Sequence, residues 1–108
     1  MPYLVQFTPD AAEQLRNLPA TDRVTIIEQC QRILSVNPTL VSKARVKRLR
    51  GGVFPPYRLR VQTHRAFYDV DEESRAVTIY GVVSKAQAAT WLAEVQEIWE
   101  EDEDSDTE

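Results

Sequence analysis

The residues best suited to chemistry lie between Lys43 and Tyr68, in the stretch KARVKRLRGGVFPPYRLRVQTHRAFY. This stretch holds eight of the 13 Lys and Arg residues of the chain and contains neither Asp nor Glu. Folding brings such charge onto a surface that suits a polyanion, and nucleic acid is the commonest polyanionic partner. The eight residues are Lys43, Arg45, Lys47, Arg48, Arg50, Arg58, Arg60 and Arg65.

Three of these arginines are spaced to act on a phosphodiester. Residues 57–61, YRLRV, alternate with period two, so a strand here places Arg58 and Arg60 on one face, and Arg65 opens the next strand. A guanidinium is planar and permanently charged, so it stabilises the charge of a pentacoordinate phosphate. The alternative interpretation is a solvated strand face.

Other side chains in the basic stretch extend this hypothesis. Histidine is the side chain whose unperturbed charge change falls near neutral pH, so His64 is a candidate acid, base or RNA contact, although a lone histidine in a turn more often has no role. Tyr68 alternates with Phe67, so one of the two faces outward, where it could contact RNA. The remaining basic residues are expected to contact the RNA backbone, and they are Arg45, Lys47, Arg48 and Arg50.

The chain has one cysteine and one histidine, which is too few for a zinc site, since such sites typically use four protein ligands. We therefore expect neither a metal nor another cofactor. Cys30 cannot form an internal disulfide, and its apolar neighbours indicate inert packing in a helix.

The net charge of −4 hides a strong asymmetry. Residues 94–108 carry nine acidic and no basic side chains, which leaves 13 basic and eight acidic side chains in the preceding 93 residues. A uniformly acidic run cannot bury enough apolar area to order itself. We expect one domain over residues 1–98 and a disordered acidic tail over 99–108. The tail could solvate the protein, fold back over the arginines or contact a partner.

Composition narrows the class of protein. A chain of 108 residues with 43 % hydrophobic residues suits a single small domain. No apolar run reaches the roughly 18 residues that a membrane span requires, and the first ten residues do not look like a signal peptide. We expect a cytoplasmic protein without membrane contact.

Hydrophobic periodicity and turn residues predict the elements that position these side chains. The predicted order is β-α-α-β-β-β-β-α, an α+β fold with a mostly antiparallel sheet, an N-terminal helical hairpin and a C-terminal helix. Thr8 is expected to cap the first helix, Thr21 or Asp22 the second and Ser84 the third. The predicted strands cover 3–8, 45–49, 57–61, 65–70 and 76–83; the helices cover 9–18, a segment from about 21 that ends before Asn37, and about 84–99.

The sequence resembles the RelE/ParE superfamily of type II toxin–antitoxin toxins. The matching segments are MPYLVQFTPDAAEQLRNLP, RLRGG, PYRLRV and HRAFYDVDEE, in family order and spacing over positions 2 to about 98. The resemblance implies a RelE-like fold in a small cytosolic toxin that a cognate antitoxin neutralises. In the RelE branch such a toxin cleaves messenger RNA on the ribosome without metal.

The same resemblance implies a set of site residues. The two basic residues of the YRLR strand correspond to Arg58 and Arg60, and the arginine opening the next strand corresponds to Arg65. A C-terminal arginine of the family corresponds to Lys85, and a tyrosine six residues later corresponds to Trp91. The chain also has Gln62-Thr63-His64 where Gly-Asp-Tyr is common. Lys is a weaker bidentate phosphate clamp than Arg, and Trp can stack on a base but has no hydroxyl.

Two alternatives remain open on this reading. The ParE branch of the superfamily poisons gyrase with the same fold. The departures at Lys85 and Trp91 are also compatible with a catalytically weak member that binds RNA or an antitoxin without turnover.

Overall fold

Five strands form one mixed sheet in the order β1-β5-β4-β3-β2. This computed structural model describes residues 2–43 and 45–106, with side chains up to Ile98. The strands β2 to β5 pair in antiparallel fashion, whereas β1 runs parallel to β5. The strands are β1 Leu4–Phe7, β2 Val46–Arg48, β3 Tyr57–Val61, β4 His64–Asp71 and β5 Ala76–Ser84. The predicted order of elements and the α+β fold are confirmed.

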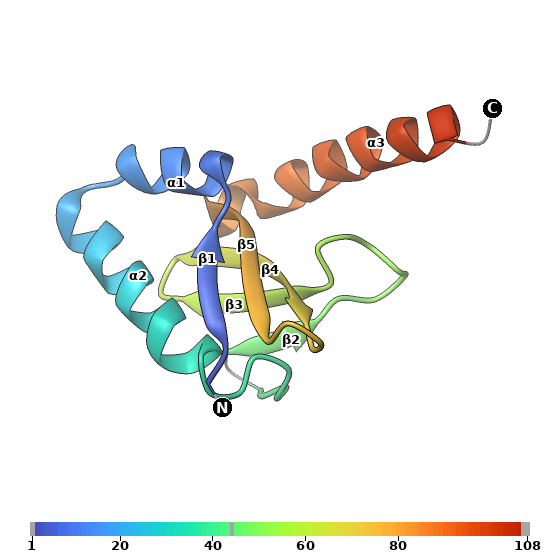
Figure 1. Cartoon of the computed structure of the whole chain (residues 1–108). Coiled ribbons are helices and arrows are strands. Elements are labelled where there is room, and N and C mark those ends of the chain that lie inside the picture. The colour runs from blue at the N-terminus through green and yellow to red at the C-terminus, as the bar shows by residue number, and fades with distance from the viewer. Residues whose placement is uncertain (1, 44, 107–108) are drawn as a thin grey trace.

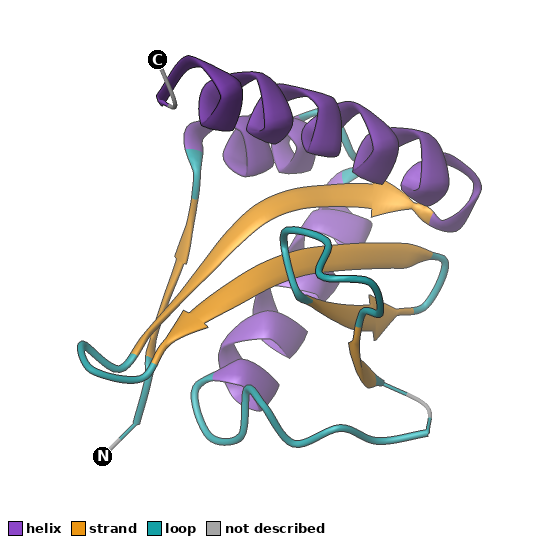
Figure 2. Cartoon of the chain, turned by 90° about the vertical axis from the view of Figure 1, so that its right-hand side faces the viewer, coloured by secondary structure: helices purple, strands orange, loops and turns teal. Residues whose placement is uncertain are grey.

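The helices divide between the two sides of the sheet. The helices α1 (Pro9–Arg16) and α2 (Ala20–Leu34) form a hairpin on one side. On the other side, α3 (Ala88–Asp106) follows a short 3₁₀ turn, η1 (Lys85–Gln87), and extends away from the sheet (Figure 1). Figure 2 shows the loop between β2 and β3 in front of the strands and α2 behind them, with α3 running along the top edge of the sheet.

The hydrophobic core lies between the sheet and the helical hairpin. Leu59 of β3, Tyr68 of β4 and Ile79 of β5 are fully buried on the side that faces α1 and α2. From α2, Ile26 and Cys30 pack into the same cluster. Burial raises the pKa of the Cys30 thiol to about 12, so the thiol stays protonated and packs as a small apolar group.

Local signals place some element ends correctly and miss others. Thr8 caps α1, because its Oγ1 accepts a hydrogen bond from the Ala11 N–H at 3.2 Å. The turn Gly51-Gly52 has φ values of 80° and 65°, a left-handed conformation that glycine adopts without strain. The predicted caps Thr21 and Asp22 are wrong, since α2 begins earlier, after Pro19. Ser84 precedes η1 but its side chain caps nothing.

The C-terminal helix differs in extent from the sequence prediction. Among its side chains up to Ile98, the half-buried ones are Ala88, Trp91, Leu92, Val95 and Gln96. The helix continues to Asp106, into the acidic stretch from 99 where disorder was expected. The division into a domain over 1–98 and a tail over 99–108 stays a prediction. No helix in the described part of the chain is long and apolar enough to cross a membrane.

Candidate functional site

Strand register brings the three predicted arginines onto one face of the sheet. Arg60 lies directly opposite Arg65 across the β3–β4 ladder, and Arg58 lies opposite Phe67. On the other side of β3, Lys47 pairs with Arg58. Leu59 points the opposite way into the core, as the alternation requires. We call the surface formed by Lys47, Arg58, Arg60 and Arg65 the arginine face; it lies on the α3 side of the sheet.

Arg65 is the fixed member of the arginine face. It is only 7 % exposed, and its Nη1 donates to the carbonyls of Gln62 at 3.2 Å and His64 at 3.0 Å. These bonds anchor the guanidinium to the turn of its own hairpin. Desolvation lowers the pKa of Arg65, and the nearby charge of Arg60 lowers it further.

Arg58 has unused hydrogen-bonding capacity. Its Nε is buried and has no hydrogen-bond partner. Desolvation lowers its pKa, and repulsion from Arg65 and Arg60 adds to the effect. In the described part of the chain, no carboxylate forms an ion pair with Arg58, Arg60 or Arg65. The three cations therefore repel one another and lack a counter-charge, which an incoming phosphate would supply.

The C-terminal helix α3 borders one end of the arginine face. The ring of Trp91 stacks on Phe67, with centroids 5.1 Å apart, and lies over Gly81. The side-chain amide of Gln96 donates to the carbonyl of Phe54 and accepts from its N–H at 3.0 Å. These contacts hold α3 against the sheet and against the loop between β2 and β3. The structure thus gives Trp91 a packing role, beside the predicted role in stacking on RNA.

Lys85 is placed at the same end of the sheet as Arg65. Its backbone N–H donates to the carbonyl of Thr63 at 2.7 Å, and Val83, two residues earlier, pairs with Arg65. The side chain is exposed. The backbone of Lys85 therefore lies at the margin of the arginine face, where the sequence resemblance predicted a cationic site residue.

Two predicted site residues lie elsewhere. His64 pairs with Val61 and therefore points to the side opposite Arg65, where it lines a hollow with Gln14 of α1. Tyr68 is fully buried, and its hydroxyl donates to the carbonyl of Pro38 at 2.6 Å. Burial excludes direct contact between Tyr68 and RNA, contrary to the sequence prediction. The side chain of His64 lies on the other face of the sheet from the three arginine side chains.

The four basic residues of 45–50 do not form one patch. Lys47 shares the arginine face, but Arg48 is paired with Tyr57 on the other face. There Arg48 donates to the Tyr57 hydroxyl at 2.9 Å, and its guanidinium carbon lies 5.2 Å from the centre of that ring. Arg45 reaches α2, where its Nη1 donates to Gln29 Oε1 at 2.6 Å. Arg50 is exposed in the loop beside the glycine turn.

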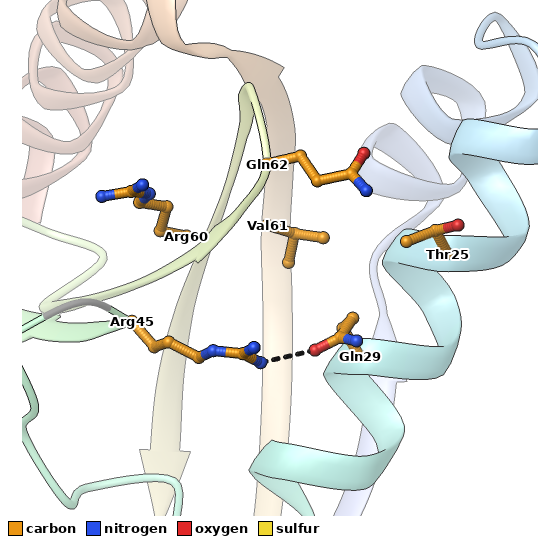
Figure 3. Close-up of a pocket in the computed structure, with 6 residues that line it drawn as sticks. All are labelled: Thr25, Gln29, Arg45, Arg60, Val61 and Gln62. Atoms are coloured by element: carbon orange, nitrogen blue, oxygen red, sulfur yellow. Dashed lines mark hydrogen bonds between the residues drawn. The ribbon is translucent and has the colours of Figure 1, made fainter.

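Sequence reasoning missed a polar hollow of about 330 Å³ between α2 and the end of β3 (Figure 3). Its lining side chains come from three separated segments, so no local pattern in the sequence could reveal it. They are Thr25, Gln29, Arg45, Arg60, Val61 and Gln62.

Comparison with known proteins decides the family. No protein-family model matches the sequence, and a comparison with curated proteins finds no match. Among solved structures, the chain is similar to the toxin–antitoxin complex RelBE2 of Mycobacterium tuberculosis, with 30 % sequence identity and a TM-score of 0.64. That match covers 78 % of this chain and 99 % of the other. The chain belongs to the RelE toxin family.

Further RelE structures share the fold. The archaeal RelE–RelB complex of Pyrococcus horikoshii matches with 26 % identity and a TM-score of 0.64, covering 78 % of this chain and 96 % of the other. A mutant of the Escherichia coli toxin RelE in the free state matches with 24 % identity and a TM-score of 0.67. It covers 91 % of this chain and 99 % of the other, which supports the RelE fold over most of the length.

Proposed function

We propose that this RelE-family protein is the toxin of a type II toxin–antitoxin pair and that it cleaves messenger RNA on the ribosome, which inhibits translation. The observation that carries the proposal is the arginine face. It presents Arg58, Arg60 and Arg65 without a counter-charge in the described part of the chain, and the buried Nε of Arg58 lacks a partner. A backbone phosphate supplies both the negative charge and the acceptor oxygens that this arrangement lacks.

The role proposed for each basic side chain follows from how firmly it is held and where it lies. Arg65 is anchored by two turn carbonyls, so it provides a fixed positive charge beside the reacting phosphate. Arg58 and Arg60 have donors available to grip the non-bridging oxygens as negative charge builds up in the pentacoordinate state. Lys85, at the margin of the face, is the candidate that gives a proton to the departing 5′-oxygen.

A cognate antitoxin and a cytoplasmic location belong to the same proposal. Similar solved structures are complexes of RelE with RelB, so an antitoxin is the expected protein partner of this chain. Any partner that places carboxylates on the arginine face relieves the repulsion there and blocks access of RNA. The ribosome and messenger RNA are the expected targets.

Inducible expression of the full chain tests the function. Growth arrest should accompany new 5′ ends within coding regions, mapped by primer extension on messages from induced cells. The variant Arg58→Ala with Arg60→Ala should abolish both effects and keep the fold, because neither side chain is bonded to the hairpin turn. Arg16→Ala removes a cation from the exposed surface of α1 and serves as the control.

Two outcomes would overturn the proposal. Growth arrest that persists in the double variant would show that the activity does not depend on the arginine face. Arrest accompanied by a DNA damage response without new message ends, together with inhibition of supercoiling by the purified protein, would identify a gyrase poison instead.

A further inference from the structure

The polar hollow between α2 and the end of β3 has the chemistry of a ligand site. Arg45 reaches across it to Gln29, while Gln62 extends towards α2 near Thr25 (Figure 3). The lining contains the Arg45 guanidinium, the amides of Gln29 and Gln62 and a hydroxyl, and no carboxylate. Arg60 also lines the hollow, but its guanidinium points away from α2 (Figure 3). A volume of about 330 Å³ lies at the lower end of the range of small-ligand pockets, enough for one nucleotide unit.

Hydrogen bonds at the hollow orient two of its side chains, Gln29 and Arg45. Gln29 Oε1 accepts from Arg45 at 2.6 Å and from Arg32 at 3.1 Å, which leaves the Gln29 amide nitrogen as a donor. Arg45 uses one of its five N–H donors in this contact and retains others for a ligand. The hollow therefore offers a cation flanked by groups that can read the edge of a base.

Two residues connect the hollow with the arginine face. Arg60 lines the hollow, and its charge acts on both Arg58 and Arg65. Gln62 contributes its side chain to the hollow, while its backbone carbonyl accepts from Arg65 at 3.2 Å. A strand whose phosphate lies on the arginine face can thus place a neighbouring nucleotide in the hollow.

We propose that this hollow is a second subsite for single-stranded RNA, in which Arg45 binds the phosphate that neighbours the reacting one and the amides of Gln29 and Gln62 contact its base or ribose. The inference rests on the proposed function and adds a recognition site to it. A nucleotide accepts from the cation through its phosphate and can both donate to and accept from the amides through its base, whereas a protein carboxylate can only accept. RNA is read in this manner, by hydrogen bonds to the edges of unstacked bases.

Nuclear magnetic resonance on the full-length, ¹⁵N-labelled protein tests the proposal. The probe is a pentanucleotide RNA with 2′-O-methyl sugars, which cannot be cleaved through the 2′-hydroxyl. It should shift the side-chain amide signals of Gln29 and Gln62 together with the Nε–H signals of the arginine face. Inorganic phosphate should shift only arginine signals, and adenosine 5′-monophosphate should bind more weakly than the pentanucleotide.

Substitutions give a second, independent readout. Arg45→Gln should weaken pentanucleotide binding about tenfold, because one charge-assisted contact is lost. The same variant should also reduce the steepness of log association constant against log salt concentration by about 0.7, as expected for the loss of one phosphate contact on a single strand. Arg16→Gln removes the same charge from α1 and should leave both quantities unchanged. Amide spectra of the free variants confirm that each is folded.

The outcomes separate this inference from the proposed function. Shifts confined to Arg58, Arg60 and Arg65, with silent Gln29 and Gln62 amides, would overturn the subsite and leave the arginine face intact. Absence of any shift would overturn both. Equal affinity for adenosine 5′-monophosphate and the pentanucleotide would make the hollow a site for free nucleotides and overturn its role along a strand.

Discussion

The two faces of the sheet use alternate residues of the same strands for opposite purposes. On the face towards α1 and α2, Leu59, Ala66 and Tyr68 are buried, and the one polar group among them, the Tyr68 hydroxyl, bonds to Pro38. On the face towards α3, Arg58 is half-buried and Arg60 is exposed, and neither forms an ion pair with a carboxylate in the described part of the chain. One face satisfies its polar groups internally, and the other leaves its charges for a ligand.

This difference shows how a small domain can carry an energetically unfavourable site. Like charges on one strand pair repel, and desolvation of Arg58 and Arg65 adds to that cost. The core on the opposite face supplies the burial that offsets it. Stability and activity should therefore respond separately when one face is changed.

The largest effect is expected on the rate of message cleavage, when a residue of the arginine face is replaced. Arg58→Gln should lower the rate of message cleavage about 10²- to 10³-fold, the usual result of removing one preorganised donor to a transition-state anion. Arg58→Lys should restore part of the rate, since lysine keeps the charge but lacks the planar fork. The measurement is a cleavage time course with purified protein and programmed ribosomes. An unchanged rate in Arg58→Gln would place this residue outside the reaction.

The next effect concerns the contact between the arginine face and α3. A Cβ at Gly81 would overlap the Trp91 ring, so Gly81→Ala should destabilise the protein by about 1–3 kcal/mol through overpacking. Urea unfolding measures the change. In a Trp91→Ala background the same glycine substitution should cost almost nothing. Costs that simply add in the double variant would show that Trp91 does not occupy this position.

A smaller effect is expected on the core face. Tyr68→Phe removes the bond to Pro38 and should lower the free energy of unfolding by about 1–2 kcal/mol, because a buried carbonyl loses its donor. The cleavage rate should stay at the level of the unsubstituted protein when both are assayed well below their melting temperatures. A large loss of cleavage rate without loss of stability would show that the Tyr68 hydroxyl takes part in the reaction.

The smallest expected effect is a gain in stability, in contrast to the losses expected above. Arg60→Gln should raise the free energy of unfolding by a few tenths of a kcal/mol at low ionic strength, because one member of a repelling cluster loses its charge. The gain should shrink as salt screens the remaining charges. Thermal unfolding at two salt concentrations measures it. A loss of stability at low salt would mean that Arg60 makes favourable contacts in the free protein.

Sequence reasoning located the arginine face but not its surroundings. The alternation of residues 57–61 placed Arg58 and Arg60 together, and the sequence pattern put Arg65 at the start of the next strand. The register that sets Arg65 opposite Arg60 came only from the structure. The prediction for Tyr68 failed because alternation tells which residues share a face and not which face is covered. The basic run of 45–50 looked uniform, yet Arg48 and Arg45 turned towards Tyr57 and α2, contacts that join segments distant in the sequence.

By itself, the sequence determined the order of the elements, the cap at Thr8, the glycine turn and the shared side of Arg58 and Arg60. These features depend on backbone preference and on periodicity over a few residues, so they are readable locally. Only the tertiary structure decided that α3 walls the arginine face, that Tyr68 is internal and that Thr25, Gln29 and Gln62 meet Arg45 around a hollow. Such contacts depend on how α2, α3 and the sheet pack, and packing is the combined result of the whole chain.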